Sequence, residues 1–317
     1  MQTERPSPRF TDIDLWEPSD VLEAMIGGQF AAVAAVRAAL PSIERASLGI
    51  EQRLRGNGRL VYAGAGTSGR LAVQDGAELM PTFSWPRDRL LLLIAGGEEA
   101  MVRAVEGAED ESEHGAAEVR RNKLDVSDVL IAVAASGTTP FTLACLREAR
   151  SRGTFTVGIA NNRETPIIYD ADEGIFLDTG AEPIAGSTRM NAGTAQRIAL
   201  NLLSSLVMIR LGRVYRGMMV DVQSTNIKLE KRKRAMVGYL TGSSDENARE
   251  ALERTDGNVK LAVLLLYGSD LESARSALER TGGRLRQALD LVGESKISKA
   301  DKRNRGRRNG KVRRALV

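Results

Sequence analysis

The stretch Arg59-Leu-Val-Tyr-Ala-Gly64-Ala-Gly66-Thr-Ser-Gly69-Arg70 joins a short apolar run to a loop whose glycines follow the G-x-G-x-x-G spacing. The run Arg59–Ala63 predicts a strand, and the residues from about Leu71 to Leu79 predict a helix. Glycines let the backbone approach an anion closely, and the N–H groups at the start of the helix then bind phosphate oxygens. The stretch therefore predicts an α/β fold with an anion site where the first strand ends.

Four further apolar runs follow at the spacing of an α/β protein. They are Leu90–Ile94, Val129–Ala134, Thr154–Ile159 and Gly174–Leu177. Of the five runs, counted from Arg59–Ala63, each of the first four is followed by glycine or hydroxyl-bearing residues. A helical segment follows most of them. This alternation predicts a doubly wound, parallel five-stranded sheet, with long helices after it over about 190–211 and 220–237.

Helical segments are expected on both sides of the sheet. Apolar residues between about Ser19 and Gly56 recur at helical spacing and predict two helices before it. Near the other end, the ten residues from Ala248 recur with two substitutions from Ala274, 26 residues later. The repeat predicts two small helical units, too few to stand alone as a solenoid, and we expect a structural or interaction module without catalysis.

These features divide the chain into four parts. We expect an N-terminal helical segment over 1–56, the α/β domain over 57–237, and a small C-terminal helical domain, similar to ubiquitin-associated domains, over 238–294. A basic tail over 295–317 completes the chain.

The charge of the chain is uneven. From Lys296 to Val317 there are ten Lys and Arg and one acid, a net charge of +9, so the remainder has 35 basic and 40 acidic residues and a net charge of −5. Such a terminal run is typical of a disordered, solvated tail, and a nucleic-acid or anion-binding arm over 296–317 is the less favoured alternative. The basic pI of the chain therefore says little about its chemistry.

Cysteine and histidine are nearly absent. With a single Cys145 and a single His114 the chain has no internal disulfide and no set of ligands for a conventional zinc site, which favours a reducing cytoplasm. Apolar stretches such as Leu202–Ile209 are shorter than a membrane span, and the first residues lack the apolar run of a signal peptide. We expect a soluble protein in which His114 is exposed in an acidic run.

A second loop favours phosphate over a dinucleotide. The third strand ends in Ala135-Ser136-Gly137-Thr138-Thr139-Pro140, at the same edge of the sheet as the first loop. A dinucleotide needs backbone glycines most, with Glu98 as a candidate for a ribose hydroxyl, whereas a monophosphate can also be held by hydroxyl groups. Those hydroxyls are on Thr67, Ser68, Ser136, Thr138 and Thr139, although for each of them helix capping alone is an equal alternative.

With these loops in place, the sequence resembles the sugar isomerase domain family, and within it the N-acetylmuramic acid 6-phosphate etherases, relatives of the glucokinase regulatory protein. The segments that carry the resemblance run in family order: Thr3-Glu4-Arg5, Gly64–Arg70, Asp75-Gly76-Ala77-Glu78, Ala95-Gly96-Gly97, 104–110, Ala134–Pro140, Gly186–Met190, Ala192–Gln196 and Met219–Val222. So many short motifs in order are far more specific than the glycine loop alone. The basic tail lies outside the resemblance.

The resemblance implies a carbon–oxygen lyase of cell-wall sugar recycling that removes D-lactate from N-acetylmuramic acid 6-phosphate. The lactyl ether at C3 of the open-chain sugar is cleaved by elimination, and water then adds to the unsaturated aldehyde, without a metal or redox cofactor. By the family's motifs, Glu78 is expected to protonate the departing lactate and Glu109 to take part in proton abstraction or hydration. The helix that binds phosphate at its start would carry Glu78 near its end.

The resemblance also implies the substrate contacts and the assembly. The phosphate is expected at the loop residues Gly66, Thr67, Ser68, Ser136, Gly137, Thr138 and Thr139. Glu182 and Arg189, in the loop before the long helix, are expected to contact the sugar or the lactyl carboxylate, and a structural ion pair is the alternative for Arg189. The expected ligand is a small sugar phosphate, and the expected assembly is a homodimer with sites near the subunit interface.

Departures from the family pattern leave alternatives open. Leu79-Met80 follows Glu78 where a Cys or Pro-rich pair is expected, Thr138 occupies a position that is Arg in some members, and Asn191 stands where Lys is expected. Without the resemblance, Glu78 is interpreted as a solvated helix residue and Glu109 as part of an acidic surface run. The alternatives are a non-catalytic sugar-phosphate sensor, an aldose–ketose isomerase and, last, a dinucleotide oxidoreductase.

Overall fold

The computed structural model describes residues 1–222 and 227–293. They form two compact units, one of residues 1–80 and 85–207, the other of residues 81–84 and the described residues from Met208 on. The first unit holds the sheet, and the second is mainly helical. The predicted boundary at residue 237 falls within the second unit, and the predicted basic tail lies outside the described residues.

A single parallel sheet of five strands forms the centre of the first unit, as predicted. Its strands are β1 (Leu60–Gly64), β2 (Leu90–Ile94), β3 (Val129–Val133), β4 (Phe155–Ala160) and β5 (Glu173–Phe176). They lie in the order β2-β1-β3-β4-β5. All residues of β1 and β3 are buried because helices cover both faces of the sheet, which is why these strands are continuous apolar runs.

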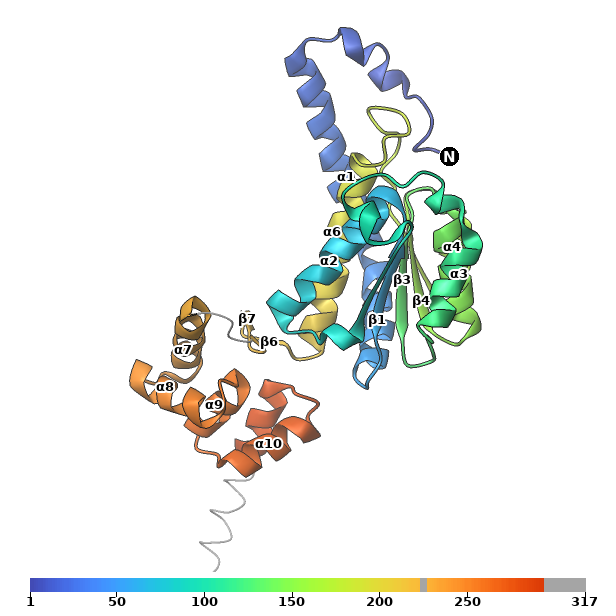
Figure 1. The fold of residues 1–317 in the computed structure, drawn as a ribbon. Coiled ribbons are helices and arrows are strands. Elements are labelled where there is room, and N and C mark those ends of the chain that lie inside the picture. The colour runs from blue at the N-terminus through green and yellow to red at the C-terminus, as the bar shows by residue number, and fades with distance from the viewer. Residues whose placement is uncertain (223–226, 294–317) are drawn as a thin grey trace, which may run out of the picture. The chain divides into compact units, whose positions relative to one another are not determined.

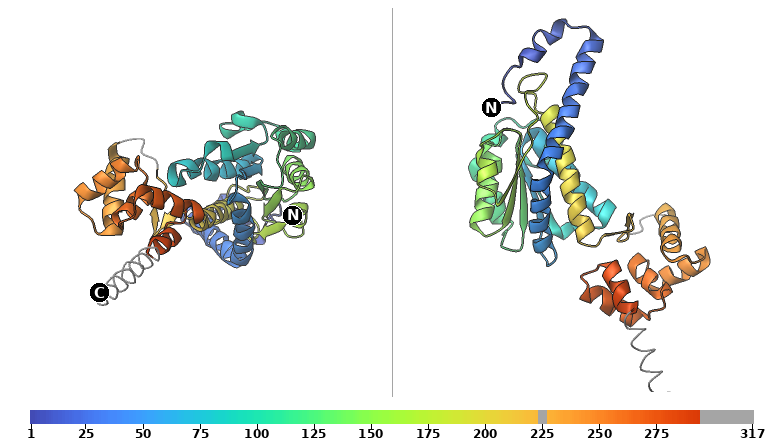
Figure 2. Two further views of the ribbon diagram at one scale, coloured as in Figure 1. Left: turned by 90° about the horizontal axis from the view of Figure 1, so that it is seen from below. Right: turned by 180° about the vertical axis from the view of Figure 1, so that it is seen from behind.

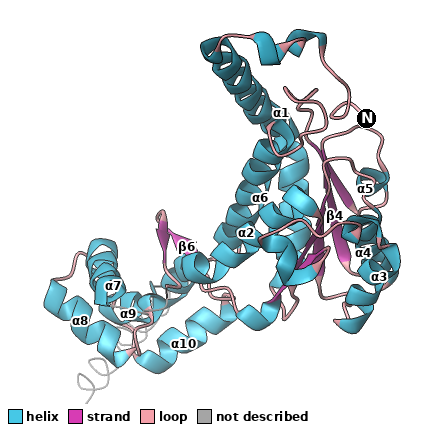
Figure 3. Cartoon of the chain, turned by 45° about the horizontal axis from the view of Figure 1, so that its top comes forward, coloured by secondary structure: helices cyan, strands magenta, loops and turns pink. Residues whose placement is uncertain are grey.

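Helices lie on both faces, so the sheet is doubly wound (Figure 1, Figure 2). One face carries α3 (Ser112–Arg121), α4 (Pro140–Ser151) and α5 (Pro166–Tyr169), and the other carries α1 (Pro18–Leu54), α2 (Gly66–Phe83) and α6 (Asn191–Arg210). The core on the α3 and α4 side includes Leu130, Phe141 and Leu146, all at most 1% exposed. Figure 3 shows α2 and α6 running side by side on the opposite face.

One long helix, α1, precedes the sheet where the sequence predicted two. Pro41 lies inside α1 and does not end it. Val36 and Ile43, on either side of Pro41, are each 2% exposed, and the helix packs against β4 and β5. Continuous burial along one face stabilises the helix across the proline, so the prediction of two separate helices was wrong.

The amino-terminal half of α1 projects beyond the sheet (Figure 1). Large apolar side chains are exposed along this helix: Leu22, Ile26, Phe30, Val33, Leu40 and Leu48. At 100° per residue these positions fall on one side of the helix, and we call them the α1 stripe. Among the described residues α1 alone has the length and apolar composition of a membrane span, a test that core helices and signal sequences also pass.

The second unit explains the internal repeat of the sequence. Helices α8 (Asp245–Arg254) and α10 (Leu271–Arg280) begin at equivalent caps, where Ser244 and Asp270 accept a hydrogen bond from the N–H three residues on. Each is followed by a further helix, α9 (Val259–Leu266) and residues 285–293. The repeat therefore encodes two helix pairs, as predicted, which share one apolar core.

The start of the second unit differs from the prediction of a helix over 220–237. Met218–Met219 form a strand, β7, that pairs antiparallel with β6 (Val214–Tyr215). The helix that follows, α7, spans Ile227–Thr241. The predicted helix therefore starts seven residues later than expected, because the residues before it turn back in a hairpin.

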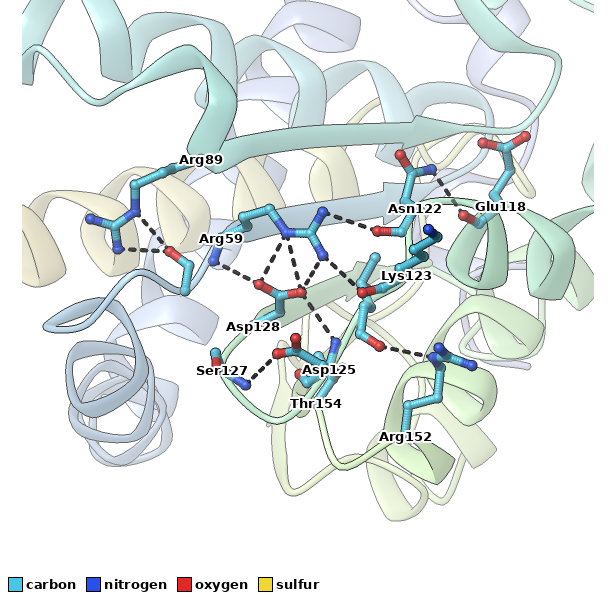
Figure 4. Close-up of polar contacts among 12 residues, drawn as sticks. Arg59, Arg89, Glu118, Asn122, Lys123, Asp125, Ser127, Asp128, Arg152 and Thr154 are labelled. Atoms are coloured by element: carbon cyan, nitrogen blue, oxygen red, sulfur yellow. Dashed lines mark hydrogen bonds and ion pairs between the residues drawn. The ribbon is translucent and has the colours of Figure 1, made fainter.

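A polar network ties the amino ends of the two central strands together (Figure 4). Asp128, which is 3% exposed, accepts bonds from the backbone N–H of Arg59 at 2.8 Å and from Nη2 of Arg59 at 2.5 Å. The hydrogen bond and the charge of Asp128 raise the pKa of Arg59. The same guanidinium donates to the carbonyls of Asn122 and Lys123, so one side chain joins β1, β3 and the end of α3.

Asp128→Ala would leave the guanidinium of Arg59 partly buried without its partner. We expect the free energy of unfolding to fall by about 2–4 kcal/mol, measured by urea denaturation. Glu113→Ala is the control, because Glu113 pairs with Arg120 on the exposed side of α3, and a change below about 1 kcal/mol is expected there. An equally small change for Asp128→Ala would contradict the structural role of this network.

Candidate active site

The two predicted phosphate loops lie next to each other. Strand β1 pairs with β2 on one side and with β3 on the other, and Gly64 at the end of β1 lies opposite Val133 at the end of β3. Neighbouring strands are about 4.8 Å apart, so the loops that follow β1 and β3 start side by side. This is the switch point of the sheet, where open α/β folds bind their ligands.

The first loop packs tightly on its own strand. A Cβ atom on Gly64 would lie 2.8 Å from Cα of Gly69, so neither position has room for a side chain. Gly66 opens α2 with a φ of +53° and open space around it. Thr67 is half-buried and Ser68 is buried beside it. The loop thus presents the first-turn N–H groups of α2 together with two hydroxyl side chains.

The second loop is held open by a glycine. Gly137 has a φ of +73°, and a Cβ atom there would lie 2.2 Å from Oγ1 of Thr165. Ser136 Oγ accepts from the N–H of Thr138 at 3.2 Å and lies 3.2 Å from Oγ1 of Thr139, the residue before α4. Three of the five predicted hydroxyl residues, Ser136, Thr138 and Thr139, therefore lie in one turn at a helix start.

The first residues of the chain return to this edge of the sheet, and sequence analysis did not identify the contact that holds them. Asn162, just beyond the end of β4, donates to Oγ1 of Thr3 at 3.0 Å and to the carbonyl of Ala135 at 2.9 Å. The carbonyl of Thr3 accepts from the N–H of Gly186 at 3.0 Å. The sequence does contain a signal for this contact, two successive asparagines after the fourth apolar run. Asparagine side chains at the end of a strand often form hydrogen bonds with the backbone of neighbouring loops.

Glu182 lies under the start of α6. It is 1% exposed, and its two carboxylate oxygens accept from the N–H groups of Asn191 at 2.8 Å and Ala192 at 2.9 Å. Burial raises the pKa of Glu182, and these two bonds oppose the rise. Glu182 therefore caps and positions α6, while a direct contact with the sugar stays a prediction.

Arg189, just before α6, and Asn191, the first residue of α6, differ in their exposure to solvent. Arg189 is exposed, and within the described residues it makes no hydrogen bond or ion pair. Asn191 is buried, and a Cβ atom on Gly28 of α1 would lie 2.4 Å from its Oδ1. The position where a lysine was expected is thus occupied by an uncharged side chain that packs against α1.

The two predicted catalytic glutamates are both exposed, and the structure does not bring them together. Glu78 lies on α2, while Glu109 lies in the 3-10 helix Ala108–Asp110, in the loop after β2. Across the described chain neither carboxylate has a hydrogen-bond or ion-pair partner. Glu78 lines a cavity of about 360 Å³, together with Leu71, Gln74, Asp75, Arg197, Ile198 and Asn201.

Glu78 is also far from the loop at the start of its own helix. Twelve residues separate it from Gly66, which is about 18 Å along the helix axis. In an extended chain each bond advances about 1.2 Å, so the five bonds from C3 of a hexose 6-phosphate to phosphorus span about 6 Å. A substrate whose phosphate is bound in front of α2 therefore cannot reach Glu78 of the same chain with its C3 atom. This corrects the expectation that one helix positions both the phosphate and the reacting carbons.

A half-buried acid that sequence analysis treated only as part of a motif, Asp75, joins β1, α2 and α6. Asp75 accepts from the hydroxyl of Tyr62 at 2.7 Å and from that of Ser204 at 3.1 Å. Burial raises the pKa of Asp75, and the two hydrogen bonds and the charge of Arg197 oppose the rise. This contact holds α6 beside α2, so the cavity at Glu78 has a fixed wall.

His114 is exposed, as predicted. Its ring nitrogens lie 3.6 Å from Glu111 and 3.3 Å from Glu118, on the outer side of α3. These are surface contacts on the face of the sheet opposite to α2.

Comparison with known proteins identifies the family. Residues 43–150 match the Glucokinase regulatory protein N-terminal SIS domain, and residues 105–206 match the SIS domain. The N-acetylmuramic acid 6-phosphate etherase of Deinococcus radiodurans is 49% identical over 84% of this chain and 87% of its own length. Those of Streptomyces avermitilis and Bacillus subtilis are 43% and 40% identical, each over 84% of this chain and over 86% and 88% of their own lengths.

A matched pair of glycine substitutions tests the second loop. Gly137 and Gly97 both have positive φ, but only at Gly137 would a Cβ atom meet a neighbour. Gly137→Ala is expected to lower the free energy of unfolding by more than about 2 kcal/mol and to weaken phosphate binding, whereas Gly97→Ala costs only the backbone strain of about 1 kcal/mol. Urea denaturation and calorimetric titration with inorganic phosphate measure both effects. Equal losses in the two variants would show that the contact with Thr165 is unimportant.

Proposed function

The chain belongs to the N-acetylmuramic acid 6-phosphate etherases, and we propose that its active site combines the two loops at the carboxyl edge of the sheet with Glu78 and Glu109. The enzyme cleaves the D-lactyl ether of N-acetylmuramic acid 6-phosphate to N-acetylglucosamine 6-phosphate and D-lactate, as a carbon–oxygen lyase of cell-wall sugar recycling. The observation that carries the proposed site is the register of β1 and β3, which sets two hydroxyl-rich loops side by side.

The loops are proposed to bind the phosphate of the substrate. Backbone N–H groups at the starts of α2 and α4 point to one edge of the sheet, and hydroxyls of Thr67, Ser68 and Ser136 lie beside them. Both helix starts favour an anion through their partial positive charge. Arg189, which no acid of the described chain neutralises, adds a full charge at the start of α6.

The glutamates are proposed to move the protons. A base takes the C2 proton, which the C1 aldehyde of the open-chain sugar makes acidic, the C3–O bond breaks, and an acid protonates the oxygen of the departing lactate. Water then adds at C3 and the proton returns to C2, so that ether and water give alcohol and lactate. Glu78 is assigned to lactate departure, and Glu109 to proton abstraction or hydration. Their exposure leaves both carboxylates accessible to a ligand.

The distance along α2 supports a site built from two chains. Because Glu78 of one chain is about 18 Å from the start of its helix, we assign the phosphate loops to one subunit and Glu78 to the other. The α1 stripe supports a homodimer as well, since an apolar stripe of this length on a projecting helix is a typical contact surface. In a twofold dimer the same arrangement yields two equivalent sites.

The cytoplasm is the proposed location. The buried Cys145 is the single cysteine of the chain and makes no disulfide, which is usual for proteins of a reducing compartment. The α1 stripe, in this proposal, is covered by the second subunit and not by a membrane.

The proposed roles of Glu78 and Glu109 are tested by measuring lactate release from N-acetylmuramic acid 6-phosphate in water enriched in ¹⁸O. Glu78→Gln and Glu109→Gln are each expected to reduce kcat by about 10²–10⁴-fold, because each removes a general acid or base. The wild type should place the label in the C3 hydroxyl of the sugar product. Sugar-phosphate binding without lactate release by the wild type would instead favour a non-catalytic sensor.

Complementation between two inactive variants tests the shared site. Ser136→Asp puts a carboxylate where the phosphate is proposed to bind, and Glu78→Gln removes the acid. Each variant alone is expected to be inactive, whereas co-expression gives half mixed dimers with one intact site each, or about one quarter of the wild-type activity. A mixture that stays inactive would place the whole site within one chain. Phe30→Asp in both chains is expected to separate the subunits and abolish the recovered activity.

A further inference from the structure

Arg197 is a cation on α6 that the proposed catalytic steps do not use. It is exposed, and among the described residues its one hydrogen-bond partner is Gln74 on α2, whose Oε1 accepts from Nη1 at 2.5 Å. The ion pairs of the described chain do not include Arg197. A guanidinium has five N–H donors, so most of its bonding capacity faces the cavity and solvent.

The position of Arg197 relative to Glu78 is set by Gln74. Gln74 and Glu78 are four residues apart on α2, which places their Cβ atoms about 6 Å apart on one face of the helix. Both line the cavity of about 360 Å³ that also contains Arg197. The guanidinium is therefore held about one helical turn from the carboxyl group that is assigned to protonate the leaving group.

The leaving group carries a charge that fits this spacing. In the lactyl ether the carboxylate is attached two bonds from the ether oxygen, so an acid on that oxygen and a cation on the carboxylate must stand a few ångströms apart. We propose that Arg197 binds the lactyl carboxylate and thereby makes the site specific for an ether that carries an acid. This inference rests on the proposed role of Glu78.

Arg189 is less suited to this role. Gly193, four residues after Arg189, would place a Cβ atom 3.6 Å from Thr67 of the first loop, so the start of α6 lies beside the phosphate. Arg197 lies two turns further along α6, beside Gln74 and Glu78. In the proposed shared site, Arg189 beside the loops of one subunit thus lies near the phosphate, and Arg197 beside Glu78 of the other subunit lies near the lactyl group.

A structural role is the competing explanation for Arg197. Its charge opposes the rise in the pKa of the half-buried Asp75, and its bond to Gln74 joins α2 to α6. If that were its whole contribution, losing it would disturb the site for every substrate alike. If Arg197 recognises the carboxylate, its loss lowers activity only with a substrate that carries a carboxylate.

The test compares two substrates, N-acetylmuramic acid 6-phosphate and its lactamide, in which an uncharged amide replaces the carboxylate. For the wild type, kcat/KM is expected to be about 10- to 100-fold higher with the carboxylate, as for a hydrogen bond to a charged group. Arg197→Gln should lose about that factor with the carboxylate substrate and less than about threefold with the lactamide, so that the preference disappears. Arg197→Lys should keep part of it, because the charge remains but the planar fork is lost.

Two further arginine variants complete the design. Arg147→Gln, on α4 in an ion pair with Asp170, is expected to match the wild type with both substrates. Arg189→Gln should lower activity with both substrates alike, since both carry the phosphate.

Two outcomes would overturn the inference: an equal loss for both substrates in Arg197→Gln, or a preference that persists in that variant. A wild type that cleaves neither substrate would instead refute the proposed function, which distinguishes the two failures. Unfolding midpoints of all variants are measured alongside, and Arg197→Lys decides the question if Arg197→Gln does not fold.

Discussion

The pairing of β1 with β3 is the constraint on which the rest of this molecule depends. It sets Gly64 opposite Val133, and because parallel strands end at the same edge, the loops after them begin about 4.8 Å apart. The contact of Gly64 with Gly69 then brings α2 close to its strand. Two helix starts and their hydroxyl side chains therefore lie at one edge of the sheet, where the phosphate of the substrate is proposed to bind.

The two edges of the sheet are built differently. At the amino edge the Arg59–Asp128 network uses most of its donors and acceptors within the protein, so it contributes to stability and leaves little to offer a ligand. At the carboxyl edge and in the cavity beside α2, Arg189 and Glu78 have no partner in the described chain. Both side chains are exposed, so water solvates their charges in the free protein and they remain accessible to a ligand.

Within one chain, the phosphate loops and the glutamate of the proposed site lie apart. The proposed acid lies three turns along α2 from the loop after β1, and α1 exposes a stripe of apolar side chains. The proposed homodimer would account for both facts, because it would cover the α1 stripe and would let Glu78 and Arg197 of one subunit serve the loops of the other.

Sequence by itself determined the five strands, the two loops and the repeat, because each depends on local patterns: apolar runs of strand length, glycines at fixed spacing, and hydroxyl side chains at helix starts. The family motifs added Glu78 and Glu109. Tertiary structure alone decided the rest. Helix α1 continues through Pro41 because it is buried against the sheet. Glu182 caps α6 because the preceding loop folds back to the start of that helix. Asp75 and Arg197 line the cavity at Glu78 because α6 lies beside α2. These are contacts between residues more than a hundred positions apart or across a loop, and no local pattern specifies them.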